Sequence, residues 1–119
     1  MPKIMIVDDN PDIIIAIREL FEPEGFEVYA CNSGWDCIEE LERGFKGIIL
    51  MDVMMPVMNG WETIGEIVNR GYHKGNIISM LTIKPESTKN PQYEKYIKDY
   101  LKKPFDSKNL INTVKGYID

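Results

Sequence analysis

Histidine and cysteine are both scarce in this sequence, and their scarcity excludes several kinds of catalytic site. His73 is the only histidine among the 119 residues, so neither a histidine-based catalytic triad nor a metal site with several histidines can form. Two cysteines, Cys31 and Cys37, are too few and wrongly spaced for a zinc site or a CxxC redox pair. We expect both to be buried thiols, although the sequence leaves a disulfide between them open. What remains is the chemistry of carboxylates, hydroxyls and lysine.

Long apolar runs and an excess of positive charge are also missing. No run approaches the length of roughly 20 residues that a membrane span requires, and the first residues do not have the pattern of a signal peptide. With 14 basic and 19 acidic side chains, the formal net charge is -5, which would repel the phosphates of a nucleic acid. We therefore expect one cytoplasmic domain, residues 1–119, that binds neither a membrane nor nucleic acid directly.

The charge is unevenly distributed along the chain. Residues 1–62 carry 4 basic and 13 acidic side chains, a net charge of -9, whereas residues 63–119 carry 10 basic and 6 acidic side chains, a net charge of +4. Such an asymmetry predicts two differently charged surfaces on one domain, the later one suited to an acidic protein partner.

Short apolar runs alternate with amphipathic stretches. The runs that predict strands are residues 4–7, 27–30, 47–51, 77–81 and 99–101. Several are apolar on both faces, as parallel strands covered by helices on each side should be. Helices are predicted with Pro11 in the first turn and an end before Pro23, after a cap at Ser33, around Trp61 to Val68, and after Asp106 or Ser107.

The fourth helical segment is the weakest. Pro85, Asn90 and Pro91 predict a loop over residues 83–92, followed by a short helix over Pro91–Ile97. The whole pattern predicts an α/β fold of the (βα)₅ type, a single domain with an open, doubly wound parallel sheet.

Polar side chains follow four of the five predicted strands. Asp8 and Asp9 follow the first, Asp52 the third, Thr82 the fourth and Lys103 the fifth. Because the carboxyl ends of parallel strands lie at one end of a sheet, where ligands bind in such folds, we expect these side chains to converge. Each of them alone would be an ordinary cap, turn or surface residue. Three carboxylates together repel one another unless a cation binds, and hard oxygen ligands favour Mg²⁺.

Four motifs in this order resemble the response-regulator receiver domain of two-component signalling, the CheY-like superfamily. They are Ile-Val-Asp8-Asp9-Asn, Leu-Met-Asp52-Val-Met-Met-Pro56 followed by Asn59-Gly60, Met-Leu-Thr82, and Asp99-Tyr100-Leu-Lys-Lys103-Pro104-Phe105. The resemblance spans essentially the whole chain. It implies a flavodoxin-like fold with strand order 2-1-3-4-5, and phosphoryl transfer from a histidine kinase or phosphotransfer protein.

The resemblance also implies roles for single residues. Asp52 would be the phosphoacceptor, a carboxylate that attacks phosphorus. Asp9, Asp52 and the backbone carbonyl of Met54 would hold Mg²⁺, with Asp8 acting mainly through bound water. Lys103 would offset charge on the transferring phosphoryl group.

A switch from one surface arrangement to another is implied as well. Thr82 would donate its hydroxyl to a phosphoryl oxygen, and Tyr100 would turn inward when Thr82 moves. Pro104 would follow Lys103 across a cis peptide bond. The surface that changes would comprise the fourth helix, fifth strand and fifth helix, and it would contact a downstream effector protein or effector domain. The chain would be a monomer or a phosphorylation-dependent dimer.

Two features depart from the family pattern. The residue after the switch threonine is usually small, but here it is Ile83, which we expect to cover Asp52 in part and to slow the entry of phosphate and water. The proline-containing fourth segment is the second departure, and it makes the partner surface unusual.

Two other functions compete with this interpretation. A receiver-like interaction module that no longer takes phosphate would explain the departures, but not the complete set Asp8, Asp9, Asp52, Thr82 and Lys103. A magnesium-dependent phosphatase with an aspartate nucleophile would need a second acid two residues after Asp52, where Met54 stands. We therefore expect no enzyme activity beyond weak self-phosphorylation and self-dephosphorylation. Flavin binding is disfavoured because the first loop is acidic.

Overall fold

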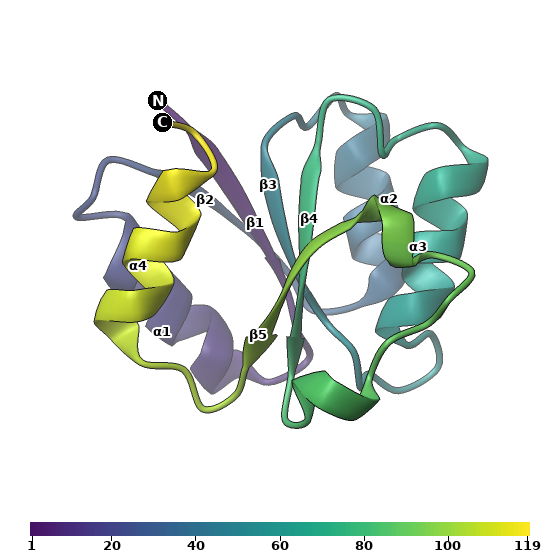
Figure 1. Cartoon of the computed structure of the whole chain (residues 1–119). Helices are drawn as coiled ribbons and strands as arrows, with labels where there is room; N and C mark the ends of the chain where they lie inside the picture. The colour runs from purple at the N-terminus through teal and green to yellow at the C-terminus, as the bar shows by residue number, and fades with distance from the viewer.

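Five parallel strands form the centre of the protein in the computed structural model, which describes all residues from Met1 to Asp119. The strands are β1 (Lys3–Val7), β2 (Glu27–Cys31), β3 (Ile48–Asp52), β4 (Ile77–Thr82) and β5 (Ile97–Lys102). They are paired in the order β2-β1-β3-β4-β5, which the resemblance implied, and every pair is parallel, as the sequence pattern predicted (Figure 1).

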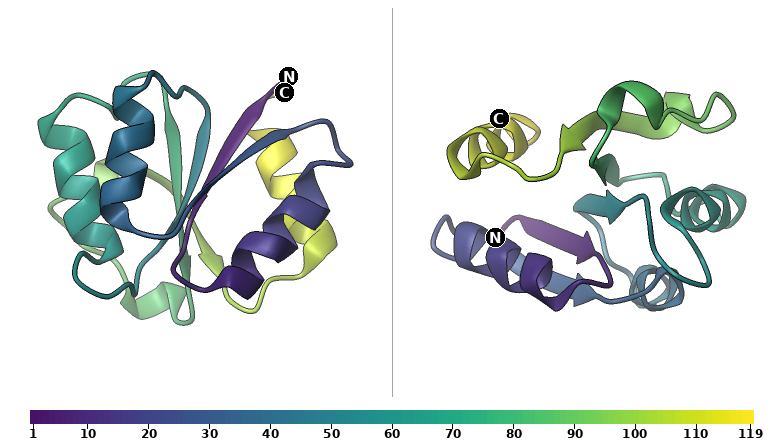
Figure 2. Two further views of the ribbon diagram at one scale, coloured as in Figure 1. Left: turned by 180° about the vertical axis from the view of Figure 1, so that it is seen from behind. Right: turned by 90° about the horizontal axis from the view of Figure 1, so that it is seen from below.

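Four α-helices connect or follow the strands. They are α1 (Pro11–Phe21), α2 (Gly34–Glu42), α3 (Gly60–Asn69) and α4 (Ser107–Gly116). Helices α1 and α4 cover one face of the sheet, and α2 and α3 cover the other (Figures 1 and 2). The sheet is therefore doubly wound, as predicted. None of the helices combines the length and apolar composition needed to cross a lipid bilayer.

Each face of the sheet has its own hydrophobic core, because successive side chains of a strand point to opposite faces. In β1, Met5 and Val7 belong to the core under α2 and α3, whereas Ile4 and Ile6 belong to the core under α1 and α4. All five residues of β3 are buried. Both cysteines are buried free thiols, so the disulfide that the sequence left open is not formed.

Side chains at the helix starts satisfy backbone N–H groups that lack partners within the helix. Ser33 accepts a hydrogen bond from the N–H of Asp36, and Asp106, rather than Ser107, caps α4. At α3, Asn59 and Glu62 form a reciprocal pair in which each side chain accepts from the other residue's N–H. This last pair starts α3 directly behind the loop that follows Asp52.

The fourth connection differs from the prediction. Instead of a short α-helix over Pro91–Ile97, the structure has two single 3₁₀ turns, η1 (Pro85–Ser87) and η2 (Glu94–Tyr96). Ile97 already pairs with Ile78 of β4, and the short segment between Pro91 and this pair forms turns that end in η2, the tighter geometry that short connecting segments often adopt. The loop prediction for residues 83–92 is confirmed apart from the turn η1.

Candidate functional site

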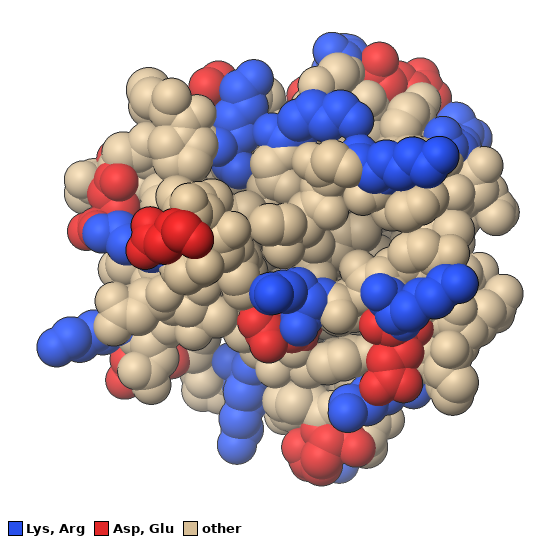
Figure 3. Space-filling model, turned by 45° about the horizontal axis from the view of Figure 1, so that its top comes forward, with Lys and Arg blue, Asp and Glu red and all other residues tan.

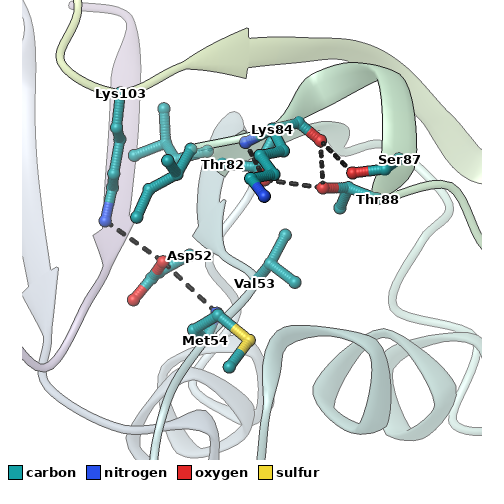
Figure 4. A pocket seen from close by; sticks show the side chains of 10 residues that line it. Asp52, Val53, Met54, Thr82, Lys84, Ser87, Thr88 and Lys103 are labelled. Atoms are coloured by element: carbon teal, nitrogen blue, oxygen red, sulfur yellow. Dashed lines mark hydrogen bonds and ion pairs between the residues drawn. The ribbon is translucent and has the colours of Figure 1, made fainter.

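The predicted site residues lie at the carboxyl end of the sheet. Asp8 follows β1, Asp52 is the last residue of β3, Thr82 is the last residue of β4, and Lys103 follows β5. The ammonium of Lys103 donates to Asp8 Oδ2 at 2.6 Å and to Asp52 Oδ1 at 3.1 Å, and Figure 4 shows the second of these contacts. Residues far apart in the sequence thus meet in one ion-paired cluster. The Lys103–Pro104 peptide bond is cis, as the resemblance implied.

The carboxylates of this cluster are withdrawn from solvent. Asp8 is fully buried, and Asp52 is 5% exposed. Burial and the neighbouring charge of Asp8 raise the pKa of Asp52, against the opposing attraction of Lys103. Burial also disfavours the charged form of Lys103, but its bonds to Asp8 and Asp52 outweigh this effect and raise the pKa of the ammonium. The single positive charge of Lys103 therefore balances only part of the negative charge on the carboxylates of the site.

Three carboxylates of the site are arranged so that they fit a metal ion. Oxygen atoms of Asp8, Asp9 and Asp52 lie within 4.8 Å of one another, and Asp9 is exposed to solvent. Hard carboxylate oxygens with access to water match the coordination that Mg²⁺ prefers. Met54 contacts this cluster through its N–H, which lies 3.4 Å from Asp52 Oδ1. The role of the Met54 carbonyl as a ligand stays a prediction.

Gly60 allows the chain to fold back tightly behind Asp52. Its N–H donates to the carbonyl oxygen of Val53 at 2.9 Å. A Cβ atom at Gly60 would lie 2.3 Å from the carbonyl oxygen of Asp52, which no side chain could tolerate without a shift of the backbone. The glycine thus holds the loop that carries Met54 against the end of β3.

An open pocket of about 390 Å³ adjoins the cluster (Figure 4). Its lining comprises Asp52, Val53, Met54, Leu81, Thr82, Ile83, Lys84, Ser87, Thr88 and Lys103. Ile83 is 69% exposed, so it forms part of the rim rather than of the buried floor. The structure places it beside Asp52 in the same pocket, and its predicted effect on phosphate and water entry stays a prediction.

Thr82 reaches the pocket but does not hydrogen-bond to Asp52. Its hydroxyl lies 2.7 Å from the hydroxyl of Thr88, and Figure 4 shows the two side chains facing one another. Sequence reasoning missed Thr88. No local pattern indicates it, because its contact with Thr82 depends on how the loop after β4 folds back.

Tyr100, the predicted switch residue, lies half-buried on β5. Its ring packs against Trp61 of α3 with a centroid distance of 6.3 Å, and the ammonium of Lys89 lies 5.6 Å from the ring centre. Its hydroxyl is buried without a hydrogen-bond partner, and burial raises the pKa of the phenol. Tyr100 is therefore next to the loop that carries Thr88, not within the carboxylate cluster.

Comparisons with known proteins agree with this geometry. Residues 4–115 match the family described as the response regulator receiver domain. The chain is 34% identical over 120 residues to a homolog of the transcriptional regulatory protein CpxR from Haemophilus influenzae, covering 99% of this chain and 51% of that relative. It is 25% identical to protein PilH of Pseudomonas aeruginosa, covering 99% of this chain and 98% of PilH. The chain thus spans about half the length of the CpxR relatives that it matches.

Solved structures extend the likeness to three dimensions. A CheY-like receiver domain protein from Methanospirillum hungatei superposes with a TM-score of 0.90 at 36% identity, covering 98% of this chain and 93% of that one. The response regulator TrrA from Thermotoga maritima, solved in complex with Mg(2+)-BeF, superposes with a TM-score of 0.78 at 26% identity, covering 98% of each chain. Motifs, strand order, site and relatives all lead to one conclusion: the chain belongs to the response regulator receiver domain family.

Proposed function

We propose that this chain accepts a phosphoryl group on Asp52 and signals by a change of its surface. The observation that carries the proposal is the ion-paired cluster of Asp8, Asp52 and Lys103 beside an open pocket. A carboxylate that lies at the end of a strand, next to a cation and a solvent-open cavity, is placed to attack an incoming phosphorus atom. The donor is a phosphohistidine on a kinase or phosphotransfer protein.

The transfer needs few groups from the chain. One Oδ atom of Asp52 forms a bond to phosphorus, the phosphorus–nitrogen bond of the donor breaks, and the leaving imidazole takes a proton from solvent. Lys103 already donates to Asp52, and from that place it can donate to a phosphoryl oxygen. Mg²⁺ held by Asp8, Asp9 and Asp52 would supply further positive charge against the phosphoryl oxygens.

The chain acts as a stoichiometric acceptor and not as an enzyme in its own right. Its single histidine, His73, precedes β4 and packs against Tyr96 at 5.0 Å, at the opposite end of that strand from Thr82. No imidazole is therefore available at the site as a general base. Turnover is limited to weak self-phosphorylation and self-dephosphorylation.

The face that includes β5 is the proposed output surface. The exposed lysines on and around it are Lys84, Lys89, Lys95, Lys98, Lys102 and Lys108. Figure 3 shows Lys and Arg side chains spread across the face seen there, with Asp and Glu side chains interspersed among them. This distribution agrees with the net charge of +4 in residues 63–119. It suits an acidic protein partner, an effector or a second copy of the phosphorylated chain, in the cytoplasm.

Intact mass spectrometry tests the proposal. Incubation with a small phosphodonor and Mg²⁺ should add about 80 Da to the wild-type chain, the mass of one phosphoryl group. Asp52→Asn should abolish the gain, whereas Asp12→Asn, which changes an exposed carboxylate of α1, should leave it intact. A chelator should prevent the gain in all forms. A wild-type chain that gains no mass would favour the competing function, a receiver-like interaction module that phosphorylation does not regulate.

A further inference from the structure

Thr88 joins three parts of the structure around the pocket. Its hydroxyl donates to the carbonyl oxygen of Lys84 at 2.6 Å and lies 2.7 Å from the hydroxyl of Thr82. Its own carbonyl oxygen accepts from the indole Nε1 of Trp61 at 3.2 Å. Thr88 thus connects the end of β4 with the start of α3 through the loop that replaces the fourth helix.

The direction of the bond between the two threonines follows from counting protons. Each hydroxyl has one proton to donate. The carbonyl of Lys84 can only accept, so the proton of Thr88 is used there. In the pair of hydroxyls, Thr82 must therefore be the donor and Thr88 the acceptor. The hydroxyl oxygen of Thr82 in turn accepts from the N–H of Lys84 at 3.2 Å.

This arrangement leaves Thr82 with no proton for any other acceptor. A phosphoryl oxygen on Asp52 can receive a hydrogen bond from Thr82 only after the bond to Thr88 has broken. We infer that Thr88 is a positioning residue that acts through Thr82: it holds the Thr82 hydroxyl in the unphosphorylated arrangement and competes with the phosphoryl group for it. The inference rests on the function proposed above. It adds a contact that opposes the active arrangement and so sets how far phosphorylation shifts the equilibrium from the inactive to the active arrangement.

The same contact links the site to Tyr100. The indole N–H of Trp61 donates a hydrogen bond to the carbonyl oxygen of Thr88, and the indole ring packs against the ring of Tyr100. A movement of Thr88 therefore changes the surroundings of both aromatic side chains, and the emission of Trp61 reports it. The other tryptophan, Trp35, lies on α2 near Arg70, and the substitution Trp35→Phe removes its contribution to the measured emission.

The test is a titration with trifluoroberyllate, a mimic of the phosphoryl group, in the presence of Mg²⁺. Emission of Trp61 is followed in the Trp35→Phe background. Thr88→Val keeps the shape of the side chain but cannot accept the proton of Thr82, and binding should tighten about fivefold, the factor for one ordinary hydrogen bond. The carbonyl of Lys84 still accepts from the N–H of Ser87, so the variant leaves no buried acceptor without a partner.

Two further variants separate this role from a general loosening of the loop. Asn90→Ala changes the same loop, and the side chain of Asn90 accepts from the N–H of Gln92 and does not line the pocket, so affinity should stay at the wild-type value. In a Thr82→Val background, Thr88→Val should have no effect on affinity, because the hydroxyl through which it acts is gone.

Each outcome decides a different question. Equal affinities of wild type and Thr88→Val, or the same tightening in the Thr82→Val background, would overturn the inference and leave the proposed function standing. A wild-type chain that does not bind trifluoroberyllate at all would overturn the proposed function together with the inference.

Discussion

The hydroxyl of Tyr117 offers a test of what attaches the C-terminal helix to the sheet. Tyr117, directly after α4, donates to Asp99 Oδ2 of β5 at 2.6 Å and lies 2.8 Å from the hydroxyl of Ser79 in β4. Because the proton of Tyr117 is used on the carboxylate, Ser79 is the donor in the second bond. Ser79 is fully buried, so water cannot replace its partner without a rearrangement of the core.

Tyr117→Phe removes both bonds and keeps the ring. A hydrogen bond to a charged group contributes about 2 kcal/mol and one between neutral groups about 1 kcal/mol. Asp99 is only half-buried and can be hydrated again after the substitution, which reduces the first contribution. We expect the free energy of unfolding to fall by about 2 kcal/mol, mostly because Ser79 is left without an acceptor.

The pH dependence gives a second, independent readout. Burial and the hydrogen bond to Asp99 raise the pKa of Tyr117 above its ordinary value of 10.0. The folded state thus favours the neutral phenol, and this stabilisation is complete below the pKa of the unfolded chain and is lost as the pH rises above it. The difference in stability between wild type and Tyr117→Phe should therefore be constant up to about pH 9 and narrow at higher pH.

Urea unfolding of both proteins at several pH values measures these quantities. Tyr100→Phe is the matched control, because it deletes a buried hydroxyl that has no hydrogen-bond partner, and it should be neutral or stabilising. A loss below about 0.5 kcal/mol for Tyr117→Phe, or a difference that does not change with pH, would refute the reasoning.

Three further predictions concern the site and the core. Asp52→Asn should raise the free energy of unfolding by about 1 kcal/mol, since burial and the charge of Asp8 disfavour the carboxylate; a lower urea midpoint would contradict this. Ile83→Ala should shorten the half-life of the acyl phosphate, measured by intact mass over time, and equal half-lives would refute the covering role. Cys31 and Cys37 are both buried, and burial raises the pKa of Cys31 to about 12. Their thiols should therefore react with a thiol reagent only as fast as the fold opens, and rapid labelling of the native protein would count against their burial.

The sheet and the carboxylate cluster could be predicted because each depends on a local pattern. A short run that is apolar on both faces predicts a covered parallel strand, and the polar residue that ends it must then lie at the carboxyl end of the sheet. Asp8, Asp52 and Lys103 therefore could be placed together from residues that are far apart in the chain.

Contacts of the fourth connection could not be predicted in this way. Pro91 and its neighbours indicated that a regular helix was unfavourable, but not what the segment would do instead. Its path depends on long-range contacts, such as Trp61 with the carbonyl of Thr88 and Tyr93 packed over Gly65 of α3. The positive φ of 67° at Val57 could not be predicted from the sequence either, because a β-branched residue rarely adopts that conformation.

The order of the strands also bears on how the chain folds. An all-parallel sheet contains no hairpins, so every strand pair closes a loop through a connection, and the pair β1–β3 joins Ile4 to Ile48. Such non-local contacts slow folding, because the entropy of closing the loop is lost before the contact is made. The ladder β2-β1-β3 is complete once the chain has reached Asp52, and β4 and β5 then add to one side in sequence order. During synthesis, the strands that carry Asp8 and Asp52 can therefore pair before the strand that brings Lys103 has left the ribosome.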